Sequence, residues 1–319
     1  MATHENKDET TEMGSVPQTD AFVELSLLDG GSFLADLSRM HEGESGTFRM
    51  YNWAFYISHK GRHVLWDLGL DEDRSCYTPW VNKHMLDICN HVGPRRSIVQ
   101  QLSERGVTAD QIDTVLFSHA HWDHSRPISD LFPHATAHFG PGTYAHCTPG
   151  HTQNPSHQFD GRFFDPIHAT EKSSELTGPW IPFGPFPKAL DYFHDGSFWI
   201  LQAPGHMPGN LAAAARLQSG EWVVLGSDCC HSRPLLDGQC QIASFQGPGN
   251  EMLSLHADVE AARSTIAKIR ILERDFGFHT ALAHDSSWLK KGEDAVLMGL
   301  LDDEMRVAAR ERIPFDEIA

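Results

Sequence analysis

The chain has 319 residues, of which 40% are hydrophobic, and this length and composition suffice for a substantial buried core. No stretch approaches the roughly 18 consecutive apolar residues of a membrane-spanning helix. The formal net charge of −18 repels phosphate backbones and anionic membrane surfaces, which argues against nucleic acid and membranes as partners.

The start of the chain and its cysteines bear on location. Residues 1–20 are polar and are predicted to be a disordered tail, with residues 21–319 forming a single domain. The first residues lack the basic flank and apolar stretch of a signal peptide, and none of the six cysteines forms a CxxC pair. Both features favour a cytoplasmic protein with free thiols.

Strand-like runs dominate the first half of the chain. Short apolar, β-branched and aromatic runs predict strands at residues 21–28, 50–58, 62–68, 114–118 and 135–139. Residues 95–105 have helical periodicity, with Ile98, Val99 and Leu102 on one face, and Gly106 ends the predicted helix.

The segment from 142 to 189 is rich in Pro, Gly, His and aromatic residues and has little periodicity. Its aromatic residues argue against disorder, so we predict an ordered insertion that covers the active site. Further strands are expected at residues 197–202, 211–217, 222–225 and 280–283, and helices at residues 258–276 and 293–312. Strands alternate with helices in both halves, so a pair of sheets flanked by helices fits best.

Four potential metal ligands lie within six residues, directly after the predicted strand 114–118: His119, His121, Asp123 and His124. Loops at the C-terminal ends of strands are where α/β sheets usually place their chemistry. Alternate side chains of an extended loop point the same way, so His119 and His121 can hold one ion. The turn that follows directs Asp123 and His124 toward a second. Zinc accepts imidazole nitrogen and carboxylate oxygen, and manganese and iron accept the same mixed set.

This H-x-H-x-D-H pattern resembles that of the metallo-β-lactamase superfamily. Further motifs of that family follow in the expected order: the G-H-x-P-G turn around His206, an acidic residue after a strand at Asp228, a late histidine at His284 and the early D-x-G at Asp67. The matched motifs span about residues 50–285. The resemblance implies an α/β fold, an αββα sandwich of two mixed β-sheets flanked by helices.

The resemblance also implies two zinc ions per chain and a role for each motif residue. The first ion would be held by His119, His121 and His206, the second by Asp123, His124 and His284, and Asp228 would bridge both. A hydroxide shared by the two cations would attack the substrate, so Asp123 and Asp228 belong to the catalytic set. Asp67 would orient a ligand histidine by accepting its other ring N–H.

Motif spacing looks like that of lactonases that open N-acyl homoserine lactones, and of microbial relatives that open cyclic amides and carbamates such as benzoxazolinones. We therefore expect hydrolysis of a small cyclic ester or amide, a signalling or xenobiotic compound, with detoxification as a possible role. Those lactonases carry Tyr three positions after the bridging aspartate, where this chain has His231. His231 either donates a hydrogen bond or a proton to the substrate, as a further catalytic residue, or is a structural histidine.

Two alternatives to ring opening stay open at this point. An acyl thioesterase of the same superfamily would share the whole ligand set. A non-catalytic metal-binding protein is the alternative from a different class, and the intact ligand set argues against it. The sequence does not determine the oligomeric state.

Overall fold

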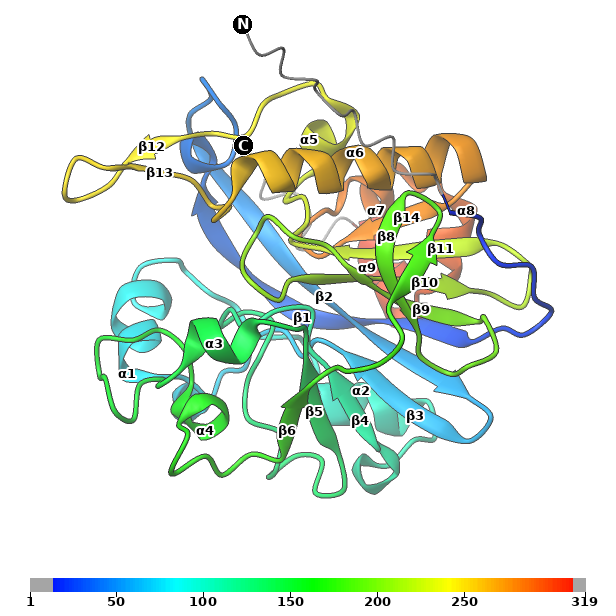
Figure 1. Cartoon of the computed structure of the whole chain (residues 1–319), viewed down its shortest axis with the longest axis horizontal. Helices are drawn as coiled ribbons and strands as arrows, with labels where there is room; N and C mark the ends of the chain where they lie inside the picture. Colours follow the sequence, from blue (N-terminus) through cyan, green and yellow to red (C-terminus); the bar gives the residue numbers. More distant parts are fainter. Residues whose placement is uncertain (1–13, 312–319) are drawn as a thin grey trace, which may run out of the picture.

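The computed structural model describes residues 14–311, in which two six-stranded sheets pack face to face (Figure 1). The strand order is β1-β2-β3-β4-β5-β6 in the first sheet and β14-β11-β10-β9-β8-β7 in the second. In the first sheet, β1 to β3 are antiparallel and β3 to β6 are parallel. In the second, β11 and β14 are parallel and the other pairs antiparallel, so both sheets are mixed.

The predicted strands are all present in the two sheets. The first sheet consists of β1 (Glu24–Asp36), β2 (Thr47–His59), β3 (Arg62–Trp66), β4 (Thr114–Leu116), β5 (Thr136–Phe139) and β6 (Ser173–Glu175). The second consists of β7 (Ile181–Phe183), β8 (Phe186–Asp191), β9 (Phe198–Gln202), β10 (Leu211–Arg216), β11 (Trp222–Ser227) and β14 (His279–Leu282). A separate hairpin is formed by β12 (Phe245–Gln246) and β13 (Met252–Leu253).

Strand β2 shows how the sequence builds the layers. Successive side chains of a strand point to opposite faces, and Trp53 and Phe55 pack between the two sheets with Ile200. Ala54 and Tyr56 instead pack on the outer face of the first sheet, in the cluster that includes helix α2. Because both faces of β2 are buried, its sequence is a nearly continuous apolar run rather than an alternating one.

Helices cover the outer faces of both sheets, which completes the predicted αββα sandwich (Figure 1). Helix α2 (Ile98–Glu104) packs on the first sheet and α6 (Val259–Phe276) on the second. Helix α6 begins after Asp258, whose side chain accepts a hydrogen bond from Ala261 N at 3.0 Å, and ends at Gly277 with φ of 71°. The remaining helices are α1 (Pro79–Val81), α3 (Thr143–Cys147), α4 (Gly161–Phe164), α5 (Arg233–Asp237), α7 (Ser287–Lys291), α8 (Ala295–Gly299) and α9 (Asp303–Glu311).

The single terminal helix predicted at residues 293–312 is wrong. The described part of this segment forms two helices, α8 and α9, separated at residues 300–302. Leu300 and Leu301 are buried in the core between the sheets, and the Leu300 carbonyl accepts a hydrogen bond from Leu27 N of β1. Asp302 then restarts the helix, because its side chain accepts from Met305 N at 2.7 Å.

The segment 142–189 contributes to both sheets as well as to the space beside them. It forms α3 and α4, then supplies β6 to the edge of the first sheet and β7 with most of β8 to the edge of the second. Residues 14–20, which fall within the predicted tail, contact this edge. Val16 packs with the α6 cluster and Thr19 Oγ1 donates to the Asp195 carbonyl at 2.7 Å. Residues 1–13 lie outside the described part.

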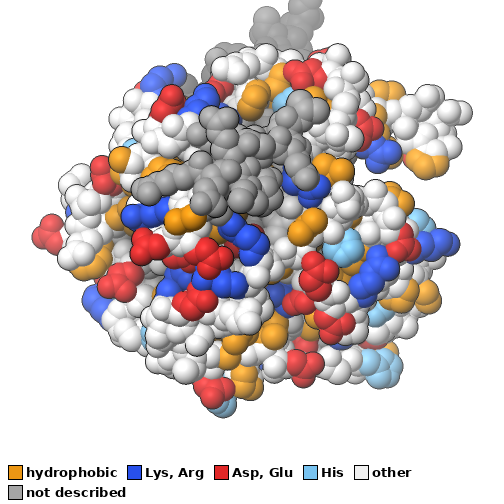
Figure 2. Space-filling view, turned by 180° about the vertical axis from the view of Figure 1, so that it is seen from behind, with side chains coloured by type: hydrophobic (Ala, Val, Ile, Leu, Met, Phe, Trp, Pro, Cys, Tyr) orange, Lys and Arg blue, Asp and Glu red, His pale blue; other side chains and the backbone are white. Residues whose placement is uncertain are grey.

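Among residues 14–311, no helix is both long enough and apolar enough to cross a bilayer. On the face opposite to that of Figure 1, acidic and basic side chains are interspersed with apolar ones (Figure 2). The charge on this face is therefore mixed in sign.

Candidate metal centre

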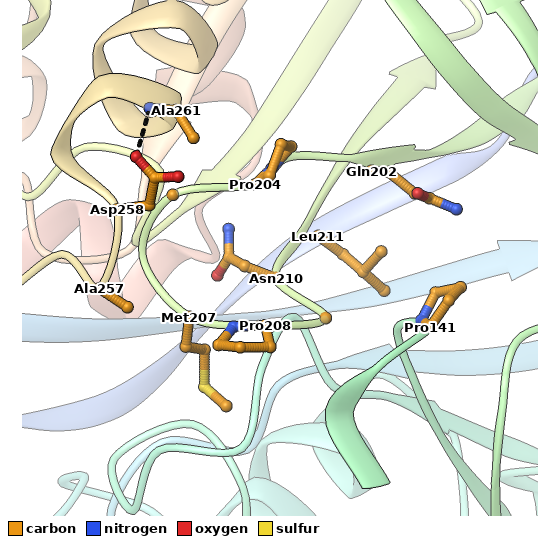
Figure 3. Close-up of a pocket in the computed structure, with 12 residues that line it drawn as sticks. Pro141, Gln202, Pro204, Met207, Pro208, Asn210, Leu211, Ala257, Asp258 and Ala261 are labelled. Carbon is orange, nitrogen blue, oxygen red and sulfur yellow. Dashed lines mark hydrogen bonds between the residues drawn. The ribbon is translucent and has the colours of Figure 1, made fainter. Parts of the chain in front are cut away.

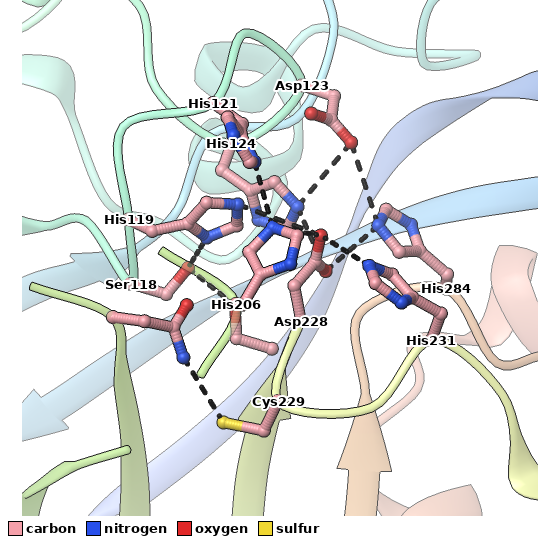
Figure 4. Close-up of polar contacts among 12 residues, drawn as sticks. Ser118, His119, His121, Asp123, His124, His206, Asp228, Cys229, His231 and His284 are labelled. Atoms are coloured by element: carbon pink, nitrogen blue, oxygen red, sulfur yellow. Dashed lines mark hydrogen bonds and ion pairs between the residues drawn. The ribbon is translucent and has the colours of Figure 1, made fainter. Parts of the chain in front are cut away.

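The seven predicted ligand side chains converge on one another (Figure 4). They are carried by loops of both sheets. They follow β4 (His119, His121, Asp123 and His124), lie between β9 and β10 (His206), or follow β11 (Asp228) and β14 (His284). Strands of the two halves that end at the same edge thus bring together residues that are far apart in the sequence.

The ligand atoms form two groups, and within each group they lie within 4.8 Å of one another. The first group is His119, His121, His206 and Asp228, and the second is Asp123, His124 and His284. Asp228 faces both groups. Its Oδ2 lies 3.6 Å from His119 Nε2 and 3.3 Å from His206 Nε2. Its Oδ1 lies 3.3 Å from His124 Nε2 and 2.9 Å from His284 Nε2.

The donor set fits metal ions. All seven side chains are buried except His121, which is partly buried. Within the described part of the chain, Nε2 of His119 and Nε2 of His124 have no hydrogen-bond partner. Buried polar atoms are nearly always paired, and imidazole nitrogen and carboxylate oxygen are ligands that zinc accepts. These nitrogens are therefore placed to bind a cation.

Electrostatics distinguish the two groups. Burial lowers the pKa of each histidine of the first group, that of His121 to about 4. Burial also acts to lower the pKa of His124 and His284, but the Asp228 carboxylate and its acidic neighbours outweigh it and raise both values. Burial acts to raise the pKa of Asp228, but His284, His124 and other imidazoles hold it well below its usual range. The first group thus offers neutral imidazoles, the form that binds metal.

Asp67 holds the loop that carries four of the ligands. Its Oδ2 accepts a hydrogen bond from His124 Nδ1 at 2.9 Å and from Ser118 Oγ at 2.7 Å, and its Oδ1 accepts from Ser118 N at 2.7 Å. The Nδ1 contact leaves His124 Nε2 directed toward the cluster. This is the orienting contact that the sequence predicted for Asp67.

Two further residues, which the sequence analysis did not identify, hold ligands of the second group. His284 Nδ1 lies 2.6 Å from the Tyr51 carbonyl, and Asn52 Nδ2 donates to Asp123 Oδ2 at 3.1 Å. Both come from β2 of the first sheet. The second group is therefore supported from a strand that contributes no ligand itself.

The backbone is unusual at two positions beside the ligands. Asp67 and Ser227 have φ of 57° and 45°, the left-handed region that non-glycine residues rarely adopt. Asp67 directly follows β3, and Ser227 precedes Asp228. Such conformations persist only where surrounding contacts impose them and they cluster at functional sites. Gly205, which precedes His206, is required for a steric reason. A Cβ at this position would lie 2.3 Å from Ala262 N of helix α6.

His231 lies inside the cluster rather than on the surface. It is 3% exposed, its Nε2 lies 3.4 Å from Asp228 Oδ2, and its ring centroid is 5.0 Å from that of His206. A further histidine, His256, lies beside it with a ring centroid 4.8 Å from that of His231. His256 lies in the loop between β13 and α6. No sequence motif around it pointed to the site.

Comparisons with known proteins identify the family. The sequence model of the metallo-β-lactamase superfamily matches residues 47–204. The chain is 30% identical over 270 residues to the metallo-hydrolase mfmC of Annulohypoxylon moriforme, and the match covers 74% of this chain and 70% of mfmC. The chain belongs to the metallo-β-lactamase superfamily.

Two other relatives differ from mfmC in length and in named activity. The chain is 30% identical over 316 residues to the cytochrome P450 monooxygenase mpaDE of Penicillium roqueforti, covering 88% of this chain and 36% of mpaDE. It thus spans about a third of the length of mpaDE. It is 25% identical over 237 residues to the gamma-lactamase FDB1 of Fusarium pseudograminearum, covering 68% of this chain and 55% of FDB1.

Solved structures show the same fold. The structure of an N-acyl homoserine lactone hydrolase, with its product N-hexanoyl-L-homoserine at the catalytic metal centre, matches with a TM-score of 0.62. The match covers 85% of this chain and 96% of that one, at 16% sequence identity. This metallo-β-lactamase superfamily member thus shares its fold with a lactone hydrolase, and its sequence relatives include a metallo-hydrolase and a gamma-lactamase.

Aromatic rings surround the histidines of this superfamily member. Phe159 of the 142–189 segment stacks on His121, with ring centroids 6.1 Å apart and planes 7° apart. Phe33 meets the His284 ring edge-on at 5.9 Å and packs against Trp122 at 5.1 Å. The candidate ligands therefore lie against aromatic side chains, and an apolar surrounding strengthens electrostatic interactions at the site.

An ion pair and a cavity lie near the loops that carry the candidate ligands. Arg126, 3% exposed, forms an ion pair with Asp71 at 2.8 Å, so it supports the loop after the H-x-H-x-D-H motif. A cavity of about 390 Å³ adjoins the His206 loop, with Gln202, Pro208 and Ala257 in its lining (Figure 3). The histidines of the two candidate ligand groups are not among its lining residues.

Proposed function

We propose that this protein is a dinuclear zinc hydrolase that opens small cyclic esters or amides. The observation that carries the proposal is the position of Asp228, whose two carboxylate oxygens face two separate groups of ligand atoms. A bound metal pair supplies an activated water and polarises the carbonyl of the substrate. The lactonase and gamma-lactamase relatives support a ring carbonyl as the reacting group.

His231 is proposed to donate the proton that ring opening requires. When the ring bond breaks, the leaving oxygen or nitrogen must gain a proton, and an amide nitrogen depends on it more than an alkoxide does. His231 Nε2 lies 3.4 Å from Asp228 Oδ2, so the ring is within reach of a substrate held beside that carboxylate. A histidine side chain can act as a general acid where its ring reaches the leaving atom. This favours cyclic amides or carbamates, alongside or instead of lactones.

The aromatic side chains beside the candidate ligands favour a small, neutral substrate. Phe159, Phe33 and Trp122 place aromatic rings against the ligand histidines. An apolar pocket with few polar groups selects small ring compounds and disfavours highly charged ones. An N-acyl homoserine lactone and a benzoxazolinone both meet this description.

A direct assay tests the proposal. Zinc-loaded protein is incubated side by side with an N-acyl homoserine lactone, benzoxazolinone and an acyl thioester, and its zinc content is measured by elemental analysis. Two zinc ions per chain and turnover of a lactone or benzoxazolinone are expected. Exclusive turnover of the thioester would replace ring opening by thioesterase activity. Full activity with one zinc per chain would refute the dinuclear centre, and no turnover with two bound zinc ions would favour a non-catalytic metal protein.

A further inference from the structure

His256 is a buried residue whose ring nitrogens have no hydrogen-bond partner in the described part of the chain. It is 3% exposed, and neither Nδ1 nor Nε2 has a hydrogen-bond partner among the described residues. Its ring lies 4.8 Å from the ring of His231 and 5.4 Å from that of His206, measured between centroids. A buried imidazole that lacks both of its hydrogen bonds requires an explanation, such as a ligand that the protein binds.

The position of His256 is fixed firmly. The backbone that follows it donates to the His206 loop, from Ala257 N to the His206 carbonyl and from Asp258 N to the Gly205 carbonyl, both at 2.9 Å. Asp258 then caps helix α6. The backbone that follows His256 is therefore anchored beside the candidate ligand groups, and such support of the backbone is what a binding residue needs.

His256 is not part of either group of metal ligands. The two groups of ligand atoms within 4.8 Å of one another contain neither His256 nor His231. The partner that completes its hydrogen bonding is accordingly expected to be an organic ligand rather than a metal ion. A neutral imidazole has one N–H donor and one acceptor nitrogen, so it suits a hydroxyl or amide, which can also donate and accept.

We propose that His256 is a specificity-determining residue that binds a hydroxyl or amide group of the substrate outside the ring that is opened. The proposal rests on the proposed function, since it assigns the second polar group of the same substrate. His231 would act on the breaking bond and His256 on the neighbouring group. Substrates that carry such a group beside the ring carbonyl are preferred over those that lack it.

The test compares two lactones and a variant. N-hexanoyl homoserine lactone carries an amide beside its ring, whereas an alkyl-substituted γ-butyrolactone of similar length carries none. His256→Phe is expected to lower kcat/KM for the acyl homoserine lactone by at least about tenfold. For the alkyl lactone, kcat/KM is expected to stay within about twofold. His256→Asn, which retains a donor and an acceptor, should recover part of the loss.

Controls separate binding from support of the fold. His138→Phe on β5 is a matched histidine replacement away from the cluster and should leave both activities unchanged. In His256→Phe the zinc content should equal that of the wild type, and the midpoint of thermal unfolding should rise because an unpaired buried imidazole is removed. Equal losses on both lactones, lost zinc or a lower unfolding midpoint would overturn the proposal.

Failure of the proposed function gives a different result. If the wild-type protein opens neither lactone nor benzoxazolinone, ring opening is refuted. The assignment of His256 as a ligand-binding residue is then decided by the unfolding midpoint of His256→Phe. A midpoint above that of the wild type supports a residue kept for binding at the expense of stability. A midpoint below it makes His256 a structural residue.

Discussion

Replacing Asp67 by Asn tests how the second group of ligands is positioned. Asp67 accepts three hydrogen bonds, two from Ser118 and one from His124 Nδ1. Asparagine has the same shape and tolerates the left-handed backbone at this position, where φ is 57°. The substitution therefore changes the charge and one acceptor while it leaves the backbone and the packing as they are.

The expected magnitude follows from those contacts. The asparagine side chain has one oxygen, which accepts hydrogen bonds, and one NH2 group, which donates them. If the oxygen keeps the hydrogen bond from Ser118 N, the NH2 group faces His124 Nδ1. His124 then loses a charge-assisted hydrogen bond, worth about 1.5–3 kcal/mol. If this free energy is lost only from the metal-bound state, zinc affinity at the second group falls roughly 10- to 150-fold. Affinity at the first group, whose histidines do not contact Asp67, should change much less.

The assay is a competition titration of both zinc ions against a chromophoric chelator. Asp113→Asn is the matched control, because Asp113 also accepts hydrogen bonds, from Arg62 Nε at 3.0 Å and His63 N at 2.9 Å, at the opposite end of β4. That control should keep both zinc affinities. Unchanged affinity at the second group in Asp67→Asn, or an equal loss at both groups, would refute the assignment of Asp67 as the residue that orients His124.

Three further predictions concern Asp228, the pH dependence of zinc affinity and the aromatic side chain of Phe159. Asp228→Asn should lower kcat by roughly a thousandfold or more while the fold persists by circular dichroism, because one carboxylate charge no longer serves both ions; near-normal turnover would contradict its bridging position. Zinc affinity at the second group should rise with pH more steeply than at the first, because the metal-free pKa values of His124 and His284 are raised and binding must release their protons. Calorimetry in buffers of different ionisation enthalpy measures this release, and equal release at both groups would contradict it. Phe159→Leu should change the ratio of kcat/KM between lactone and benzoxazolinone without loss of zinc, since Phe159 stacks on His121; an unchanged ratio would place the segment outside substrate recognition.

The sequence predicted which side chains gather at the candidate metal centre because their signals are local. His119 to His124 follow a short strand within six residues, and each remaining ligand directly follows a strand or lies in a glycine-containing turn. Asn52 and His256 have no such context. Asn52 lies inside an apolar strand and His256 in a loop, and only tertiary packing brings them to the cluster.

The errors in the fold have the same origin. Periodicity alone predicted one terminal helix, but burial of Leu300 against β1 and the cap formed by Asp302 divide it. The strand β6 is a polar triplet, Ser173–Glu175, that becomes a strand only by pairing with β5. Propensity is a weak guide where pairing with a distant segment decides the conformation.

The distribution of the ligands between the two halves links metal binding to the packing of the sandwich. Four ligands follow β4 of the first sheet, and the other three lie on loops of the second. Each group of ligand atoms contains residues from both halves. A cation in either group therefore joins the two sheets, and an ion that binds only the folded arrangement stabilises it. In the metal-free protein the Asp228 carboxylate raises the pKa values of His124 and His284, and these imidazoles hold the pKa of Asp228 well below its usual range, so the same contacts attract the two halves to each other.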